Sequence, residues 1–178
     1  FLQTGVGLSW TYGRHGEACA GPGRHNFLGE AYDPADHTID PKIHIKNTMH
    51  AMTMYGAIDD NGLCFFMGPS VDTLVDLEML YDTIGVKADV RKMIRDSANT
   101  ILKIYEFNKS RGVNIRPLPK HFYEHGTYGN KQTEEDALPF NVPFELIKTY
   151  GFEVLNNVAS GCETVPETLL EKSKSRYK

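Results

Sequence analysis

The sequence contains few of the features that mark several common classes of protein. Among its 178 residues there are only three cysteines, Cys19, Cys64 and Cys162. An odd number of widely spaced cysteines does not make the dense disulfide framework of a small secreted domain. Free cysteine is among the most frequently buried residue types, so the plainest interpretation of each one is an inert thiol in the core.

Positive charge and long apolar runs are also scarce. The 19 lysines and arginines are outnumbered by 23 aspartates and glutamates, which leaves a formal net charge of -4. This balance gives no electrostatic reason to expect nucleic acid or an anionic membrane as a partner. No apolar run approaches the roughly 18 residues of a membrane-spanning helix. A hydrophobic content of 40% and a charged content of 24% are typical of one globular domain.

Residues 1–41 differ from the rest of the sequence. They are rich in Gly, Pro, Asp and His and have no sustained periodicity. Ordering such a backbone is entropically costly, and a long irregular segment in a compact protein is usually functional or disordered. The aromatic residues Trp10 and Tyr12 argue against disorder, so we expect an ordered loop that wraps around something. Because the sequence begins at Phe1, we interpret it as part of a longer protein.

Residues 42–178 are expected to form a helical domain. The signals are the capping residues Asp40 and Ser70 of the first two helices, apolar spacings of three and four, and the glycines that end the second and third helices, Gly85 and Gly112. No convincing alternating strand is found, so the predicted class is mainly α with much irregular structure. The expected helices run from Pro41 to Asp59 or Asp60, from Ser70 to Gly85, from about Val90 to Gly112, and from Pro143, with a last short helix and a frayed basic tail.

The third of these helices has the clearest apolar stripe. We interpret the stripe as core, because a stripe at helical spacing usually packs inside the protein. Its members are Val90, Ile94, Ala98 or Ser97, Ile101 and Tyr105, widened by Leu102 and Phe107.

The segment DDNGLC, residues 59–64, joins the first expected helix to the second. Gly62 permits a left-handed turn in which backbone N–H groups point inward together. Asp59 would accept hydrogen bonds from those amides or from a ligand, and Leu63 would pack the turn onto the core. Cys64 would then be a buried, rigid thiolate near several donors, as a metal cluster requires. A capped turn followed by a buried cysteine explains the same residues equally well.

These residues resemble the D-x-x-G-L-C motif of the tungsten-containing aldehyde:ferredoxin oxidoreductase family, with Asp59, Gly62, Leu63 and Cys64 matching position for position. Other segments are similar to further parts of that family in the same order, from about residue 4 to 174. They are TGVGLSW, ANTILKIYEFNKSRG, LPKHFYEHG, VPFELIKTYGFE and VPETLLEKS. The resemblance implies the C-terminal helical region of that fold, with a long irregular Gly-rich cofactor loop.

The resemblance also implies cofactors. The family holds tungsten through the dithiolenes of two pterins, beside one [4Fe-4S] cluster. Cys64 would be the fourth cluster ligand, while Asp59, Gly62 and Leu63 would hold a pterin. The family's C-x-x-C-x-x-x-C segment and N-terminal domains are missing from this sequence. They would act as partners, together with ferredoxin or an electron-transfer subunit and an aldehyde or carboxylic acid substrate, in a reducing cytoplasm.

The Gly-rich segment departs from the family pattern. Aldehyde-oxidising members resemble Arg-Gly-Ala-Cys-His here, whereas this sequence has Ala20 directly after Cys19. A related branch, the tungsten benzoyl-CoA reductases, places a cysteine thiolate on tungsten, and Cys19 is the candidate for that role. An acyl-CoA would then be the substrate. Glu17 is a candidate general acid or base and His25 a candidate for the missing histidine. A buried thiol and a polar loop acid are the alternative interpretations.

Other candidates have weaker functional interpretations. His121 and His125 flank two aromatic residues and would line a substrate funnel or lie at the surface. His44 and His50 are six residues apart on one helix, on different faces, so a shared metal site is not expected. Cys162 matches no family ligand and is interpreted as structural or exposed. The alternative function from another class is a helical scaffold module that has lost the redox centre.

Overall fold

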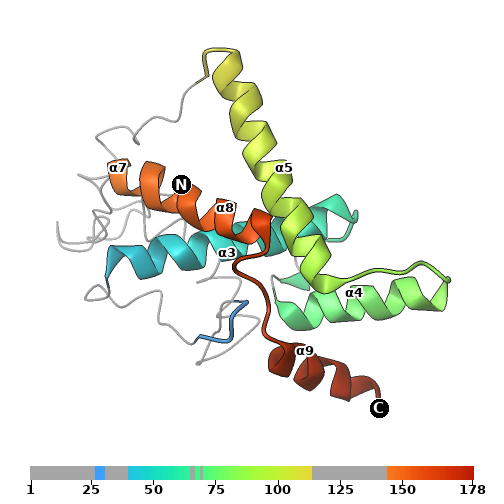
Figure 1. Ribbon diagram of the computed structural model, residues 1–178. Helices are drawn as coiled ribbons and strands as arrows, with labels where there is room; N and C mark the ends of the chain where they lie inside the picture. Colours follow the sequence, from blue (N-terminus) through green and yellow to red (C-terminus); the bar gives the residue numbers. More distant parts are fainter. Residues whose placement is uncertain (1–26, 31–39, 65–66, 69, 114–143) are drawn as a thin grey trace, which may run out of the picture.

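The computed structural model describes residues 27–30, 40–64, 67–68, 70–113 and 144–178. These residues form helices and turns, and none of them lies in a strand, which confirms the mainly α class. Helices α3, α5 and α8 pack against one another at the centre, and α9 packs against α4 (Figure 1).

Helix α3, Pro41–Asp60, begins and ends where the sequence predicts. Asp40 is its N-cap, because its side-chain oxygen accepts a hydrogen bond from the backbone N–H of Lys42 at 2.8 Å. Pro41 occupies the first turn, where a backbone N–H has no intrahelical partner. The helix therefore starts with both of the local signals that specify a start.

Helices α4 and α5 are also specified by their caps. Helix α4, Val71–Thr83, follows Ser70, and helix α5, Val90–Ser110, follows Asp89. In each case the side-chain oxygen of the cap accepts a hydrogen bond from the backbone N–H three residues later, at 3.0 Å and 2.6 Å respectively. These bonds satisfy donors that the first turn leaves unpaired.

The centre of the core lies where α3 meets α4 and α5. Helices α3 and α5 approach closely at Gly56, where an added Cβ would lie 2.2 Å from the Oγ of Ser97. The hydroxyl of Ser97 is buried and has no hydrogen-bond partner in the part of the chain that the structure describes. The main cluster includes Phe27, Met54, Ile58, Leu74, Val75, Val90, Ile94 and Ala98.

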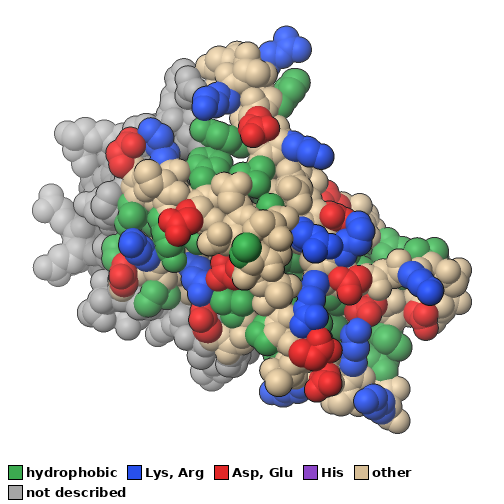
Figure 2. Space-filling view, in the orientation of Figure 1, with side chains coloured by type: hydrophobic (Ala, Val, Ile, Leu, Met, Phe, Trp, Pro, Cys, Tyr) green, Lys and Arg blue, Asp and Glu red, His purple; other side chains and the backbone are tan. Residues whose placement is uncertain are grey.

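The apolar stripe of α5 is only partly core. Its first half is buried as predicted, at Val90, Ile94 and Ala98. Phe107 was expected to widen the buried face, but its side chain is 60% exposed, so that expectation is wrong. The reason is geometric, because the last turns of α5 extend past α3 and α8 (Figure 1). Hydrophobic side chains are exposed along this part of the helix (Figure 2).

The helix expected from Pro143 is longer than its sequence suggests. Helix α7, Phe144–Leu146, the π-helix η3, Ile147–Gly151, and helix α8, Phe152–Ser160, follow one another directly. The helix continues through Gly151. A glycine is required there because α3 packs closely against this position. An added Cβ there would lie 2.7 Å from the Cε of Met49.

The C-terminal residues are packed against α4. Helix α9, Glu167–Lys174, contacts α4, and the 3-10 turn η4, Ser175–Tyr177, continues from it. The hydroxyl of Ser173 donates a hydrogen bond to Asp72 at 2.5 Å. The expected frayed tail is therefore wrong for residues up to Tyr177.

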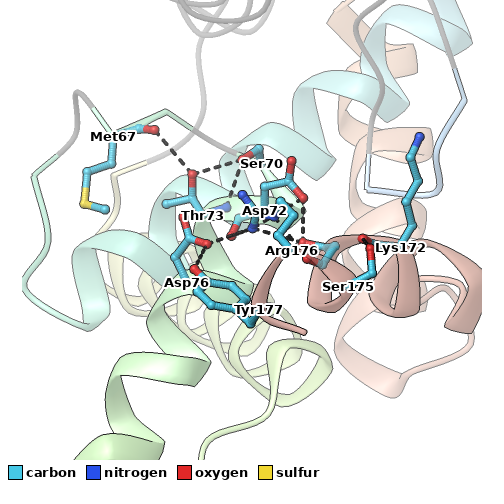
Figure 3. A network of polar contacts seen from close by, with 10 residues as sticks. Met67, Ser70, Asp72, Thr73, Asp76, Lys172, Ser175, Arg176 and Tyr177 are labelled. Atoms are coloured by element: carbon cyan, nitrogen blue, oxygen red, sulfur yellow. Dashed lines mark hydrogen bonds and ion pairs between the residues drawn. The ribbon is translucent and has the colours of Figure 1, made fainter.

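Arg176 and Tyr177 complete this contact (Figure 3). The guanidinium of Arg176 donates to the carboxylate of Asp76 at 2.7 Å and to the backbone carbonyl of Asp72 at 3.0 Å. The hydroxyl of Tyr177 donates to the same carboxylate of Asp76. We call these four residues, with Ser173, the α4–η4 clasp. Side chains of both charges are interspersed over this part of the surface (Figure 2).

Candidate functional site

The turn that carries the D-x-x-G-L-C motif is a helix C-cap. Gly62 has a φ of 70°, in the left-handed region, as predicted. Its backbone N–H donates to the carbonyl of Asp59 at 2.9 Å, and the N–H of Leu63 donates to the carbonyl of Ile58 at 3.1 Å. This pair of bonds is the Schellman arrangement, which satisfies carbonyls at the end of a helix.

Helices α4 and α5 end in the same way. The N–H of Gly85 donates to Asp82 and that of Val86 to Tyr81, both at 3.0 Å. After α5, Gly112 has a φ of 77°. Its N–H donates to Lys109 and the N–H of Val113 donates to Asn108, so the same pair of bonds is formed. The glycine of the motif is therefore explained by helix termination, without a ligand.

Two expectations about this turn need correction. The amides of Gly62 and Leu63 do not converge on a thiolate or a ligand, because helix carbonyls already accept their hydrogen bonds. Asp59 accepts through its backbone carbonyl, and within the described part of the chain no donor contacts its carboxylate. Its side chain is exposed to solvent.

Cys64 is exposed and not buried as the sequence suggested. The apolar residue that enters the core is its neighbour Leu63, which packs against the cluster containing Ile58. The turn is braced from the other side by Asn61, whose side-chain oxygen accepts a hydrogen bond from the hydroxyl of Tyr81 at 2.8 Å. The result is a free thiol at the surface, directly after a turn held at several points.

The other candidates from the sequence are not brought to this turn. Glu17, Cys19 and His25 lie outside the described residues, as do His121 and His125. Cys162 is exposed at the end of α8, in agreement with its interpretation. No group of three or more His, Cys, Asp or Glu side chains in the described ranges is arranged to hold a metal ion.

A second cluster, which the sequence analysis did not assign a role, surrounds His50. The His50 side chain is fully buried, with 0% exposure, and its ring stacks on Phe27 at a centroid distance of 3.8 Å. Its Nε2 lies 3.3 Å from a carboxylate oxygen of Glu163. Lys46 contacts Glu163 at 3.3 Å and Glu30 at 3.2 Å. We call these residues the His50 cluster.

Burial and charge act in opposite directions in this cluster. Burial lowers the pKa of His50, and the attraction of Glu163 does not compensate. Burial alone would raise the pKa of Glu163, but His50 and Lys46 outweigh it and the pKa is lowered. Burial likewise opposes the charge on Lys46, yet Glu30 and Glu163 raise its pKa. At neutral pH the cluster therefore holds a neutral imidazole beside a Lys46–Glu163 ion pair.

A sequence signal for part of this cluster existed. His50 precedes the buried Met54 and Ile58 by four and eight residues, so the three share one helical face. That spacing predicts burial of His50 but not its partner, because Glu163 comes from the loop after α8, far along the chain.

Comparisons with known proteins identify no relative. No protein-family model matches the chain, and no match is found among the curated proteins or the solved structures compared with it. Among the described helices, none combines the length and the hydropathy that a bilayer-spanning segment requires.

Proposed function

We propose that this chain is the C-terminal segment of a tungstopterin, [4Fe-4S] oxidoreductase that couples two-electron oxidation or reduction of an aldehyde or carboxylic acid to ferredoxin. The ordered series of sequence resemblances supports this proposal. The structural observation that carries it is the position of Cys64, a free and exposed thiol at the end of a braced turn. The exposed sulfur differs from the buried thiolate expected from the sequence, and the missing domains would have to cover it together with the iron that it would bind.

The residues of the turn fit the proposed cofactors in part. The sulfur of Cys64 is accessible and would ligate iron, and the carboxylate of Asp59 is exposed and would accept hydrogen bonds from pterin N–H groups. The amides of Gly62 and Leu63 do not fit, because the helix cap uses them. The chain has three cysteines, fewer than the four thiolates of a usual [4Fe-4S] cluster. The remaining ligands would come from the missing N-terminal domains.

The chain's own contribution would be to hold one ligand in place. The pterin-bound tungsten would supply two-electron chemistry, and the cluster would supply one-electron transfer. Leu63 anchors the turn in the core and Asn61 is bonded to Tyr81, so the main chain before Cys64 is fixed on both sides. A fixed ligand keeps the distance and orientation of a redox centre constant. An oxygen-sensitive cluster implies a reducing compartment, so we propose a cytoplasmic location.

The Gly-rich segment would decide between two subclasses. In the aldehyde-oxidising subclass, Glu17 and His25 would act beside the metal. In the benzoyl-CoA reductase-like subclass, the thiolate of Cys19 would bind the metal directly and favour low-potential chemistry on an aromatic acyl-CoA.

A helical scaffold that has lost the redox centre is the second candidate. The observation that favours it is the complete hydrogen bonding of the turn, which repeats the caps of α4 and α5. On this alternative, Asp59, Gly62 and Leu63 act only in ending α3.

Metal analysis of the protein isolated anaerobically from its own cells separates the two candidates. The proposal predicts one tungsten and about four iron atoms per site. Cys64→Ser should lower the iron content, whereas Cys162→Ser, which removes another exposed free thiol, should leave it unchanged. Absence of both metals from the unaltered protein would support the scaffold.

The subclasses are separated by their reactions. Viologen-linked oxidation of aldehydes is expected of the first, and turnover of an aromatic acyl-CoA of the second. A Cys19→Ser variant that keeps full tungsten and full activity would exclude direct ligation by Cys19.

A further inference from the structure

Residues 27–30 are held to the body of the protein through His50. The ring of Phe27 is fully buried and stacks on the imidazole with an interplanar angle of 22°. From the same segment, Glu30 binds Lys46 on the helix that carries His50. Gly29 lies near α9, since an added Cβ would be 3.8 Å from the side chain of Leu169. One of the contacts that hold the segment is therefore a stack whose second member is a titratable group.

The surroundings of His50 suit a neutral ring. With the described residues, neither ring nitrogen makes a hydrogen bond of ordinary geometry, although Nε2 lies 3.3 Å from Glu163. The charged groups that face it are Lys46 from α3, Glu30 from the 27–30 segment and Glu163 from the loop after α8. Tyr150 of η3 lies in the same field, as burial and the nearby carboxylates raise its pKa. Within the described ranges, the carboxylate in contact with the ring is that of Glu163, which is already paired with Lys46.

We propose that His50 is an acid-sensitive latch, whose protonation releases residues 27–30 from α3. An imidazolium has two N–H donors and a full charge. Glu163 would accept from one of them, while the other would stay buried without an acceptor, which is strongly unfavourable. Opening toward water solvates the positive charge and gives the second N–H an acceptor. The group that has to move for this opening is Phe27. This inference does not depend on the proposed redox function.

Native-state hydrogen exchange at several pH values tests the latch in the full chain. The readout is the protection factor of the amides of Leu28, Gly29 and Glu30, corrected for intrinsic exchange and compared with amides in the middle of α5. Between the ordinary histidine pKa of about 6.5 and the lowered pKa of His50 in the folded state, protection of the segment should fall by up to about tenfold per pH unit, because opening takes up one proton there. Protection in α5 should stay constant over the same range.

Two variants control this experiment. His50→Phe keeps an aromatic ring for stacking but cannot take up a proton, so the segment should stay protected at all pH values tested. His44→Gln removes another histidine of the same helix and should leave the pH dependence unchanged. The latch is overturned if His50→Phe keeps the pH dependence, or if α5 loses protection in parallel with the segment.

An NMR titration of the unaltered chain gives a second test that does not require a folded variant. The imidazole signal of His50 and the ring signals of Phe27 should change together on acidification, with one midpoint below the ordinary histidine value of about 6.5. Titration of His50 without any change at Phe27 would refute the latch.

Discussion

At the scale of single residues, the motif Asp59–Cys64 separates into two parts with different explanations. Gly62 and Leu63 are explained by local backbone chemistry, since the left-handed glycine and the two amide bonds end α3. The exposure of Cys64 has no such local explanation. The proposed redox function therefore depends on the thiol and on the carboxylate of Asp59.

Substitution of Gly62 by alanine tests the cap interpretation. A side chain in the left-handed region costs about 1–2 kcal/mol, and an added Cβ here meets nothing within 4 Å, so no clash contributes. Gly85→Ala is the matched control, because its φ of 75° and its open surroundings are similar. The two variants of the isolated chain should lose equal stability in chemical denaturation. A much larger loss at Gly62 would mean that this turn does more than end a helix.

At the scale of elements, helix contacts were harder to predict than helix starts. The caps at Asp40, Ser70 and Asp89 lie within a few residues of the atoms they bond, so their effect is visible in the sequence. Gly56 and Gly151 sit inside helices, where glycine is normally unfavourable, and only the position of a neighbouring helix explains them.

The contact between Gly56 and Ser97 gives a prediction for the α3–α5 interface. Gly56→Ala should destabilise the fold by up to about 2 kcal/mol, because overpacking costs about 1–3 kcal/mol and the better helix propensity of alanine returns about 1 kcal/mol. Ser97→Ala alone should be neutral or stabilising, since it removes a buried hydroxyl without a partner.

The double variant gives the decisive comparison at this interface. With Ser97→Ala present, the nearest atom to the new Cβ of Gly56→Ala is the Cβ of residue 97 at 3.5 Å, an ordinary contact. A double-mutant cycle compares the unaltered protein, the two single variants and the double variant. The unfolding free energies of these four proteins should give a coupling energy between the two substitutions of at least about 1 kcal/mol. Additive effects would show that the two helices do not approach as described.

The α4–η4 clasp should make a small contribution to the unfolding free energy, and this contribution should decrease as the salt concentration rises. Arg176 and Asp76 are both about two-fifths exposed, and exposed pairs contribute up to about 1 kcal/mol. Arg176→Gln should lower the unfolding free energy by about that amount in dilute buffer, and by less in 1 M salt, where the screening length falls to about 3 Å. Lys178→Gln removes the same charge next to the clasp and should have no effect. Equal effects of the two variants would contradict the described contact.

At the scale of the whole molecule, the sequence predicted the class and most helix boundaries but not the joining of distant parts. The clasp connects Asp76 to Arg176, and the His50 cluster connects Glu30, Lys46 and Glu163. Such pairs come from different elements, and no local pattern in the chain specifies them. The same limit applied to Cys64, whose exposure depends on which side of the turn faces the core.

The His50 cluster makes the global stability depend on pH in a stated direction. His50 and Glu163 have lowered pKa values in the folded state, so their contributions are present above the ordinary values of 6.5 and 4.5 and are lost as the pH falls. Lys46 has a raised pKa, so its contribution is complete below 10.5 and is lost at higher pH. As far as these three groups determine it, the unfolding free energy should be nearly constant between pH 6.5 and pH 10.5, and should fall at lower and at higher pH.

Denaturation of the unaltered chain and of His50→Phe across this pH range measures the effect. The variant should lose the part of the acid dependence that begins below pH 6.5, and the part that begins near 4.5 should become smaller, because His50 and Lys46 together lower the pKa of Glu163. Identical curves for the two proteins would assign the acid dependence to other groups.

The proposed redox function is tested most directly by the reactivity of two thiols. In the chain alone, Cys64 and Cys162 are both exposed and should react with a maleimide at similar rates. In the protein isolated anaerobically with its metals, Cys64 should be protected while Cys162 still reacts, and oxidative removal of iron should restore the reaction of Cys64. Reaction of Cys64 as fast as Cys162 while about four iron atoms remain bound would contradict its role as a cluster ligand.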